Sequence, residues 1–155
     1  IKAQKEKAPI IFAEEAMFDL VSQKTENGWI FSKSDFPILK DELGGLAQEK
    51  NAKTVLTSIV ELRKSGFYIP EDAVYNGFAH VVELTGLMGR WQVLQENPKI
   101  ICDTGHNAHG IRYIAEQLKS ESYDKLHIVF GMVNDKDINS PLSAPWMRIF
   151  LPMRH

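Results

Sequence analysis

Short apolar or aromatic runs, separated by glycine and asparagine, come first along the chain. They predict strands over residues 9–13, 28–32 and 36–39, because runs of this length bounded by turn-forming residues are typical of strands. Gly44 and Gly45 close this segment. The first quarter of the chain is therefore predicted to be rich in β structure.

From residue 52 the apolar positions recur every three or four residues, which is the period of one helix face. Gly66 follows where a C-terminal cap belongs. A second helix is predicted from Pro70, because Glu71 and Asp72 place acids near the positive end of the helix dipole. Its buried face is expected at Val74, Phe78, Val81 and Val82. Its end is expected at Gly86.

The remainder reads as alternating strands and a helix. Residues 91–93 alternate between apolar and polar, residues 96–98 read as a turn, and residues 100–102 and 126–130 are apolar runs. Between the last two lies a helix whose apolar stripe is formed by Ile111, Ile114, Ala115 and Leu118. A strand, a helix and a strand within about 30 residues predict a right-handed βαβ unit with parallel strands.

Ligands of such open sheets bind beyond the carboxyl ends of the strands. Two polar clusters follow the predicted parallel strands, at residues 103–107 and 134–137. Both clusters are therefore expected on one rim of the sheet.

Composition narrows the class of protein. The 155 residues are 44% hydrophobic and 25% charged, which is typical of a globular domain. A net charge of −2 gives no indication of a nucleic-acid surface. No apolar run reaches the roughly 18 residues of a membrane span, and a single cysteine excludes a disulfide within the chain. We expect a cytoplasmic protein with neither membrane nor nucleic-acid partners. Because the chain begins with Ile1, we also expect it to start inside a longer protein.

Three residues of the first polar cluster carry candidate chemistry. Asp103 ends a strand, where a carboxylate can accept from ribose hydroxyls or bind a metal, but it can equally cap a helix or form an Asx-turn. His106 can donate to a sugar or phosphate oxygen, whereas Asn107 suits the helix cap. His106 and His109 lie three residues apart, but no second pair supports a metal site, so none is assigned.

Arg90, Asn51 and Cys102 are weaker signals. The planar guanidinium group of Arg90 suits a phosphate because it can donate two hydrogen bonds at once, and the carboxamide of Asn51 could pair with adenine. Either residue could also simply be solvated. Neighbouring side chains in a strand point to opposite faces, so Cys102 is interpreted as a small buried residue and not as a nucleophile.

Together these pieces resemble the folylpolyglutamate synthase/dihydrofolate synthase family of the Mur ligase superfamily over about residues 9–138. The resemblance rests on four motifs in the same order as in the family, at residues 46–52 (LAQEKNA), 89–93 (GRWQV), 103–107 (DTGHN) and 130–137 (FGMVNDKD). Their joint occurrence is far more specific than any one of them.

The resemblance implies an α/β fold, with the end of a central ATPase domain over residues 1–88 and the start of a truncated Rossmann-like domain over residues 89–155. It implies an ATP-dependent ligase that adds L-glutamate to folate or dihydropteroate through an acyl phosphate. Asn51 would contact adenine, Asp103 the ribose and Arg90 the phosphates, with His106 beside the nucleotide. Arg90 and His106 are the catalytic candidates. ATP and Mg²⁺ are the implied cofactors, with the magnesium ligands expected before Ile1.

Two features depart from the family. A glycine-rich phosphate loop ending in Lys-Ser/Thr is absent from the chain, and residues 140–155 show no βα continuation. The loop 135–137 receives no role. We therefore expect the chain alone to be inactive. The competing hypothesis is a non-catalytic nucleotide-binding or interaction module.

Overall fold

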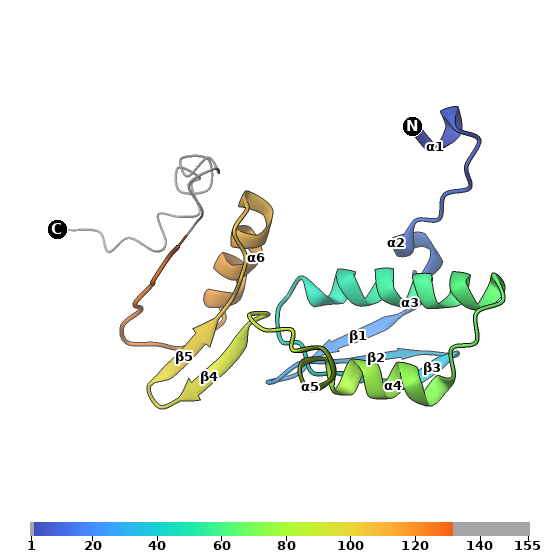
Figure 1. Cartoon of the computed structure of the whole chain (residues 1–155). Helices are drawn as coiled ribbons and strands as arrows, with labels where there is room; N and C mark the ends of the chain where they lie inside the picture. The colour runs from blue at the N-terminus through green and yellow to red at the C-terminus, as the bar shows by residue number, and fades with distance from the viewer. Residues whose placement is uncertain (1, 132–155) are drawn as a thin grey trace. The chain divides into compact units, whose positions relative to one another are not determined.

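A computed structural model describes residues 2–131 of the chain (Figure 1). The chain divides into two compact units, which are described separately. Unit 1 comprises Ile1–Gly44 and Gln48–Leu87, and unit 2 comprises Gly45–Ala47 and Met88–His155. Helices and strands occur in both units. Within the described range, no helix has the length and apolar character needed to cross a membrane.

Unit 1 is built on a three-stranded antiparallel sheet in the order β1 (Val21–Lys24), β2 (Trp29–Lys33), β3 (Phe36–Asp41). In Figure 1 the strands lie between the helices α3 and α4. Phe31 of the central strand is fully buried and stacks on Trp29 at 6.0 Å between ring centroids. The two strands predicted over residues 28–32 and 36–39 are thus confirmed as β2 and β3.

The strand predicted over residues 9–13 was wrong. Those residues form no strand, and the short helix α2 (Ala13–Ala16) begins at their end, after a first short helix, α1 (Lys2–Lys5). Ile10, Ile11 and Phe12 remain 45–49% exposed. The more polar β1 pairs with β2 instead. An apolar run becomes a strand only where a neighbouring strand can satisfy its backbone groups, and the run itself does not identify that neighbour.

Helix α3 (Gln48–Lys64) confirms the helical period, with Ala52 and Leu56 buried. Gly66 ends it in the left-handed conformation at φ 91°. The amide of Phe67 donates to the carbonyl of Leu62 at 3.0 Å, and that of Gly66 to Arg63 at 3.0 Å. These two bonds are the Schellman pattern of a helix end, so the predicted glycine cap is also confirmed.

The second predicted helix is divided in two, α4 (Glu71–Ala79) and α5 (Val81–Thr85), with a break at His80 (φ −134°, ψ 40°). In a continuous helix the amide of Val82 would donate to the carbonyl of Phe78. Here the carbonyl of Phe78 accepts from the amide of Glu42 at 3.2 Å, and the amide of Val82 donates to the Glu42 carboxylate. Glu42 therefore supplies a donor to the Phe78 carbonyl and an acceptor to the Val82 amide, two groups that would bond to each other in a continuous helix. Gly86 ends α5 as predicted, at φ 70°.

Unit 2 contains the strands β4 (Gln92–Glu96) and β5 (Lys99–Cys102), followed by α6 (Ala108–Leu118). The two strands are antiparallel and joined by the predicted turn. The parallel βαβ unit was therefore wrong for the described residues, because β5 pairs with β4 and residues 126–131 form no strand. A two-residue connection lets neighbouring segments pair at little cost in chain entropy. The polar residues 134–137 lie outside the described range.

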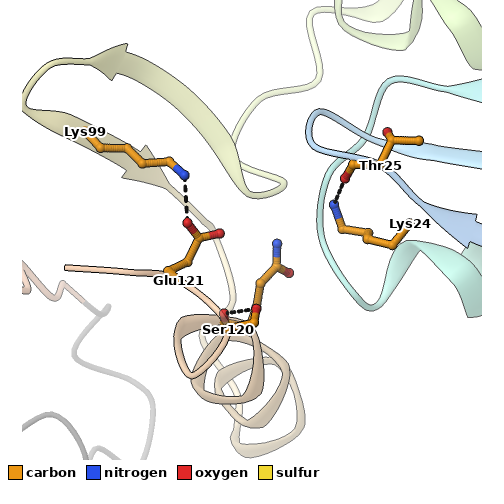
Figure 2. A network of polar contacts seen from close by, with 6 residues as sticks. Lys24, Thr25, Lys99, Ser120 and Glu121 are labelled. Atoms are coloured by element: carbon orange, nitrogen blue, oxygen red, sulfur yellow. Dashed lines mark hydrogen bonds and ion pairs between the residues drawn. The ribbon is translucent and has the colours of Figure 1, made fainter.

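Helix α6 covers a small core to which Ile111 and Ala115 contribute, as the apolar stripe predicted. The buried Gln117 accepts from the amide of Leu46 at 2.9 Å, which ties the segment Gly45–Ala47 to this unit. At the helix end, Ser120 Oγ donates to the Gln117 carbonyl at 2.7 Å, and Lys99 pairs with Glu121 at 2.7 Å (Figure 2). Figure 2 also shows Lys24 of unit 1 donating to the Thr25 carbonyl at 2.8 Å.

Candidate functional site

The segment that leads into β4 has an unusual backbone. Gly89 and Trp91 both have positive φ values, 70° and 54°, on either side of Arg90. Such a conformation is uncommon for a residue other than glycine. Trp91 is only 7% exposed, so packing holds this residue in place. The amide of Gly89 donates to Gln92 Oε1 at 3.0 Å. The backbone around Arg90 is thus held in one particular shape.

Asp103 directly follows β5, and its carboxylate joins two parts of the chain. Oδ2 accepts from the amide of Trp91 at 2.8 Å, and Oδ1 accepts from the amide of Gly105 at 2.7 Å. The second bond is the Asx-turn that the sequence left open as an alternative. The first brings Asp103 beside the Arg90 segment, although β5 is not a parallel strand.

Gly105 is closely surrounded in this turn. A Cβ atom there would lie 2.7 Å from Ile114 Cδ1 and 3.0 Å from Asp103 Oδ1. Helix α6 therefore packs closely behind the turn, and a larger residue at this position would require the Ile114 and Asp103 side chains to shift.

Thr104, which the sequence reasoning missed, contacts the Arg90 segment directly. Its amide donates to the Gly89 carbonyl at 2.9 Å, and its hydroxyl donates to the same oxygen at 3.1 Å. Arg90 Nη1 donates to the Thr104 hydroxyl oxygen. A Cβ atom on Gly89 would lie 2.5 Å from Thr104 Cγ2, so the two segments touch. No sequence signal marks this contact, because it joins residues on different segments.

His106 and Asn107 open α6. The Asn107 side chain accepts from the amide of Gly110 at 2.8 Å, which confirms it as the N-cap. His106 Nδ1 lies 3.0 Å from the Thr104 carbonyl. A carbonyl only accepts, so Nδ1 carries the proton, and the Nε2 of this exposed residue accepts when the ring is neutral and donates when it is charged.

Asn51 belongs to unit 1, where it lies exposed in the first turn of α3. Its Nδ2 donates to Gln48 Oε1 at 2.9 Å. A carboxamide has two N–H hydrogens and one acceptor oxygen. One N–H and the oxygen of Asn51 are therefore still available for a ligand. Arg90, Asp103 and His106 all belong to unit 2, so the structure gathers three of the four candidates in one unit.

Residues with metal-binding side chains do not cluster in this part of the molecule. Among residues 2–131, no three His, Cys, Asp or Glu side chains are grouped so as to hold a metal ion. His109 packs edge-on against Tyr113 at 5.0 Å between ring centroids. Cys102 is a half-buried thiol on β5. The described side chains around Arg90 and Asp103 therefore form a polar loop in which no cluster fits a cation.

Comparison with known proteins identifies the relatives of this chain. Residues 89–147 match the family model described as "Mur ligase, glutamate ligase domain". The match continues past Asn139 as far as residue 147, so the expectation that the resemblance ends near residue 138 was wrong for residues 140–147. A family model weighs every position, whereas residues 140–147 contain no short motif that is recognisable by itself.

Dihydrofolate synthase/folylpolyglutamate synthase of Escherichia coli (strain K12) is 32% identical over 125 residues, which cover 80% of this chain and 27% of that protein. The protein of the same name from Bacillus subtilis (strain 168) is 27% identical over 133 residues, which cover 83% of this chain and 29% of that protein. The chain therefore spans somewhat more than a quarter of the length of these curated relatives.

Solved structures agree with these relatives. E. coli FolC in complex with DHPP and ADP superposes with a TM-score of 0.56 at 30% identity, over 84% of this chain and 30% of that one. The complex of the same protein with ADP, without folate substrate, gives a TM-score of 0.55 at 29% identity, over 86% and 30%. The predicted α/β class, with a Rossmann-like Mur ligase C-terminal domain, is confirmed. On this evidence, the chain belongs to the folylpolyglutamate synthase/dihydrofolate synthase family of Mur ligases.

Proposed function

We propose that this chain forms part of an ATP-dependent ligase that joins L-glutamate to folate or dihydropteroate. The carrying observation is that Asp103, Arg90 and His106 lie in one connected loop system of unit 2, inside the segment that matches the ligase family. The ADP and DHPP named with the E. coli structures support a nucleotide and a pterin-type substrate.

The proposed reaction has two steps. The γ-phosphoryl group of ATP passes to the carboxylate of the acceptor, which gives ADP and an acyl phosphate. The amine of glutamate then attacks the acyl carbon, loses a proton, and expels phosphate as the amide bond forms. In such phosphoryl transfer, catalysis consists mainly of positioning and of stabilising charge on the phosphate oxygens.

Arg90 suits the phosphates, because its planar guanidinium donates two hydrogen bonds at once. The N-terminus of α6 adds backbone N–H groups, which favour anions. Asp103 suits the ribose: two of its roughly four lone-pair sites accept from backbone amides, and the rest can accept from hydroxyls. His106 offers Nε2 to a sugar hydroxyl when neutral or to a phosphate oxygen when charged.

The two parts of the chain receive separate roles in this proposal. Residues 1–88 form the end of the central ATPase domain and supply Asn51 to adenine, and residues 89–155 begin the ligase domain. The start of the family match at residue 89 supports this boundary. When bound, Mg²⁺ would neutralise charge on the phosphates. We assign it no ligand among residues 2–131, since no cluster there fits a cation.

A ligase chimera tests the proposal. Residues 9–138 replace the matching segment of the E. coli relative, and ADP release is measured with and without glutamate and dihydropteroate. We expect one ADP per glutamate added, and no ligation by the 155-residue chain alone. A chimera that is folded and binds ATP, but releases no ADP in response to glutamate, would indicate a non-catalytic nucleotide-binding module instead.

Asn51→Ala in this chimera is expected to raise KM for ATP about fivefold to 30-fold and to leave kcat nearly unchanged. Adenine is remote from the transferred phosphoryl group, so its contacts contribute equally to the ground and transition states. Loss of a partly exposed hydrogen-bond pair costs about 1–2 kcal/mol. Steady-state kinetics with varied ATP measures both constants. Asn76→Ala, an exposed asparagine of α4, is the matched control. An unchanged KM would make Asn51 a solvated residue of the helix start.

A further inference from the structure

The Thr104 hydroxyl lies between a carbonyl oxygen and a guanidinium group. Its oxygen is 3.1 Å from the Gly89 carbonyl oxygen and accepts from Arg90 Nη1. A threonine hydroxyl has one hydrogen and two lone pairs. The carbonyl can only accept, so the hydrogen points to Gly89 and the lone pairs are left for Arg90. A guanidinium can only donate, so the directions of these hydrogen bonds are compatible with all three groups. Arg90 Nη1 also donates to the Gly89 carbonyl at 3.5 Å.

The backbone on either side of Arg90 is held by the same turn. The Thr104 amide donates to the Gly89 carbonyl at 2.9 Å, and the Asp103 carboxylate accepts from the Trp91 amide at 2.8 Å. With the backbone thus restrained, the main freedom left to Arg90 is that of its long side chain. The Thr104 hydroxyl contacts the end of that side chain.

We propose that Thr104 is a positioning residue for Arg90. Its hydroxyl holds the guanidinium in the orientation in which it meets the transferred phosphoryl group, so less order has to be gained between bound ATP and the transition state. The consequence for catalysis rests on the proposed function. The restraint on Arg90 is a property of the chain itself and is tested separately.

Two substitutions distinguish the hydroxyl from the rest of the side chain. Thr104→Val keeps the branched shape that packs against Gly89 but can neither donate nor accept. Thr104→Ser keeps the hydroxyl and loses the methyl group. Both leave the Thr104 amide in place, so the backbone bond to Gly89 is retained in each variant.

Nitrogen-15 NMR of the 155-residue chain measures rotation of the Arg90 guanidinium about its Nε–Cζ bond, with Arg90→Lys used to assign the signal. We expect slow rotation in the wild-type chain and in Thr104→Ser, and at least about fivefold faster rotation in Thr104→Val, the change that loss of one ordinary hydrogen bond produces. Equal rotation rates in the wild type and in Thr104→Val would overturn the proposal, whatever the activity of the ligase chimera.

Kinetics of the ligase chimera measures the consequence. We expect Thr104→Val to lower kcat about tenfold or more, because a hydrogen bond to a charged group is stronger than an ordinary one. KM for ATP should stay nearly unchanged, and Thr104→Ser should be close to the wild type. In an Arg90→Ala background, Thr104→Val should have no further effect, because the group it positions is gone. An equal loss in both backgrounds would show that Thr104 acts independently of Arg90 and would refute the proposal. If Arg90→Ala itself left kcat unchanged, that result would count against the proposed function instead.

Discussion

Arg90→Ala is expected to lower kcat of the ligase chimera by about 10²–10³-fold, the typical loss when one donor aimed at developing charge is removed. Negative charge on the phosphate oxygens shifts during transfer, so a guanidinium placed there stabilises the transition state more than bound ATP. KM for ATP should change much less. Initial rates of ADP release at saturating glutamate and dihydropteroate, with ATP varied, separate the two constants.

Arg112→Ala is the matched control, because Arg112 is an exposed arginine on α6 in the same unit. It should leave both constants near their wild-type values. Arg90→Lys keeps the positive charge but loses the planar guanidinium with its paired donors. Its kcat should therefore lie between that of Arg90→Ala and that of the wild type. If Arg90→Ala raised KM and left kcat unchanged, Arg90 would bind ATP without acting on the transferred group.

Asp41→Asn is expected to stabilise unit 1 at neutral pH by up to about 3 kcal/mol. Asp41 ends β3 and is only 6% exposed, and burial raises the pKa of its carboxyl to about 6. The amide of Leu43 donates to this carboxylate at 3.0 Å, and an asparagine oxygen can accept the same bond. The substitution therefore removes the buried charge and keeps its hydrogen bond.

The pH dependence follows from the direction of that shift. The folded state holds the Asp41 proton more tightly than the unfolded chain, so its contribution is fully present below about pH 4 and is lost as the pH rises to about 6. The stabilities of unit 1 in Asp41→Asn and in the wild type should thus be equal near pH 4, and their difference should grow up to about pH 6. Hydrogen exchange of the β2 and β3 amides, compared at equal pH, measures this difference.

Asp35→Asn provides the control, because Asp35 lies exposed in the turn between β2 and β3. Asp35→Asn should change the free energies of hydrogen exchange little, both at about pH 4 and at about pH 6. A constant difference between Asp41→Asn and the wild type from about pH 4 to about pH 7 would show that Asp41 does not titrate in this range.

Local signals in the sequence were sufficient for several elements. The period of α3, its glycine end at Gly66 and the Asn107 cap of α6 all agree with the structure. Each depends on hydrogen bonds between residues close together in the sequence. Interactions of this range are specified by the residue types themselves, so no knowledge of the rest of the fold is needed.

Contacts between distant residues explain the predictions that were wrong. The helix predicted from Pro70 breaks at His80 because Glu42, 40 positions before Val82, takes over the bond between Phe78 and Val82. The apolar run at residues 9–13 has no partner strand, whereas the polar β1 has one. Neither partner can be identified from the local pattern.

The candidate site divides in the same way. Residue type and position in the sequence made Arg90, Asp103 and His106 candidates, and the family resemblance assigned them to the phosphates, the ribose and the side of the nucleotide. The roles of these residues remain to be tested by the substitutions above. Folding decides that both oxygens of Asp103 accept backbone amides, and that Thr104 meets Arg90 across 14 positions of sequence. A threonine in a turn has no distinctive signature, since its function here depends entirely on which group the fold places against its hydroxyl.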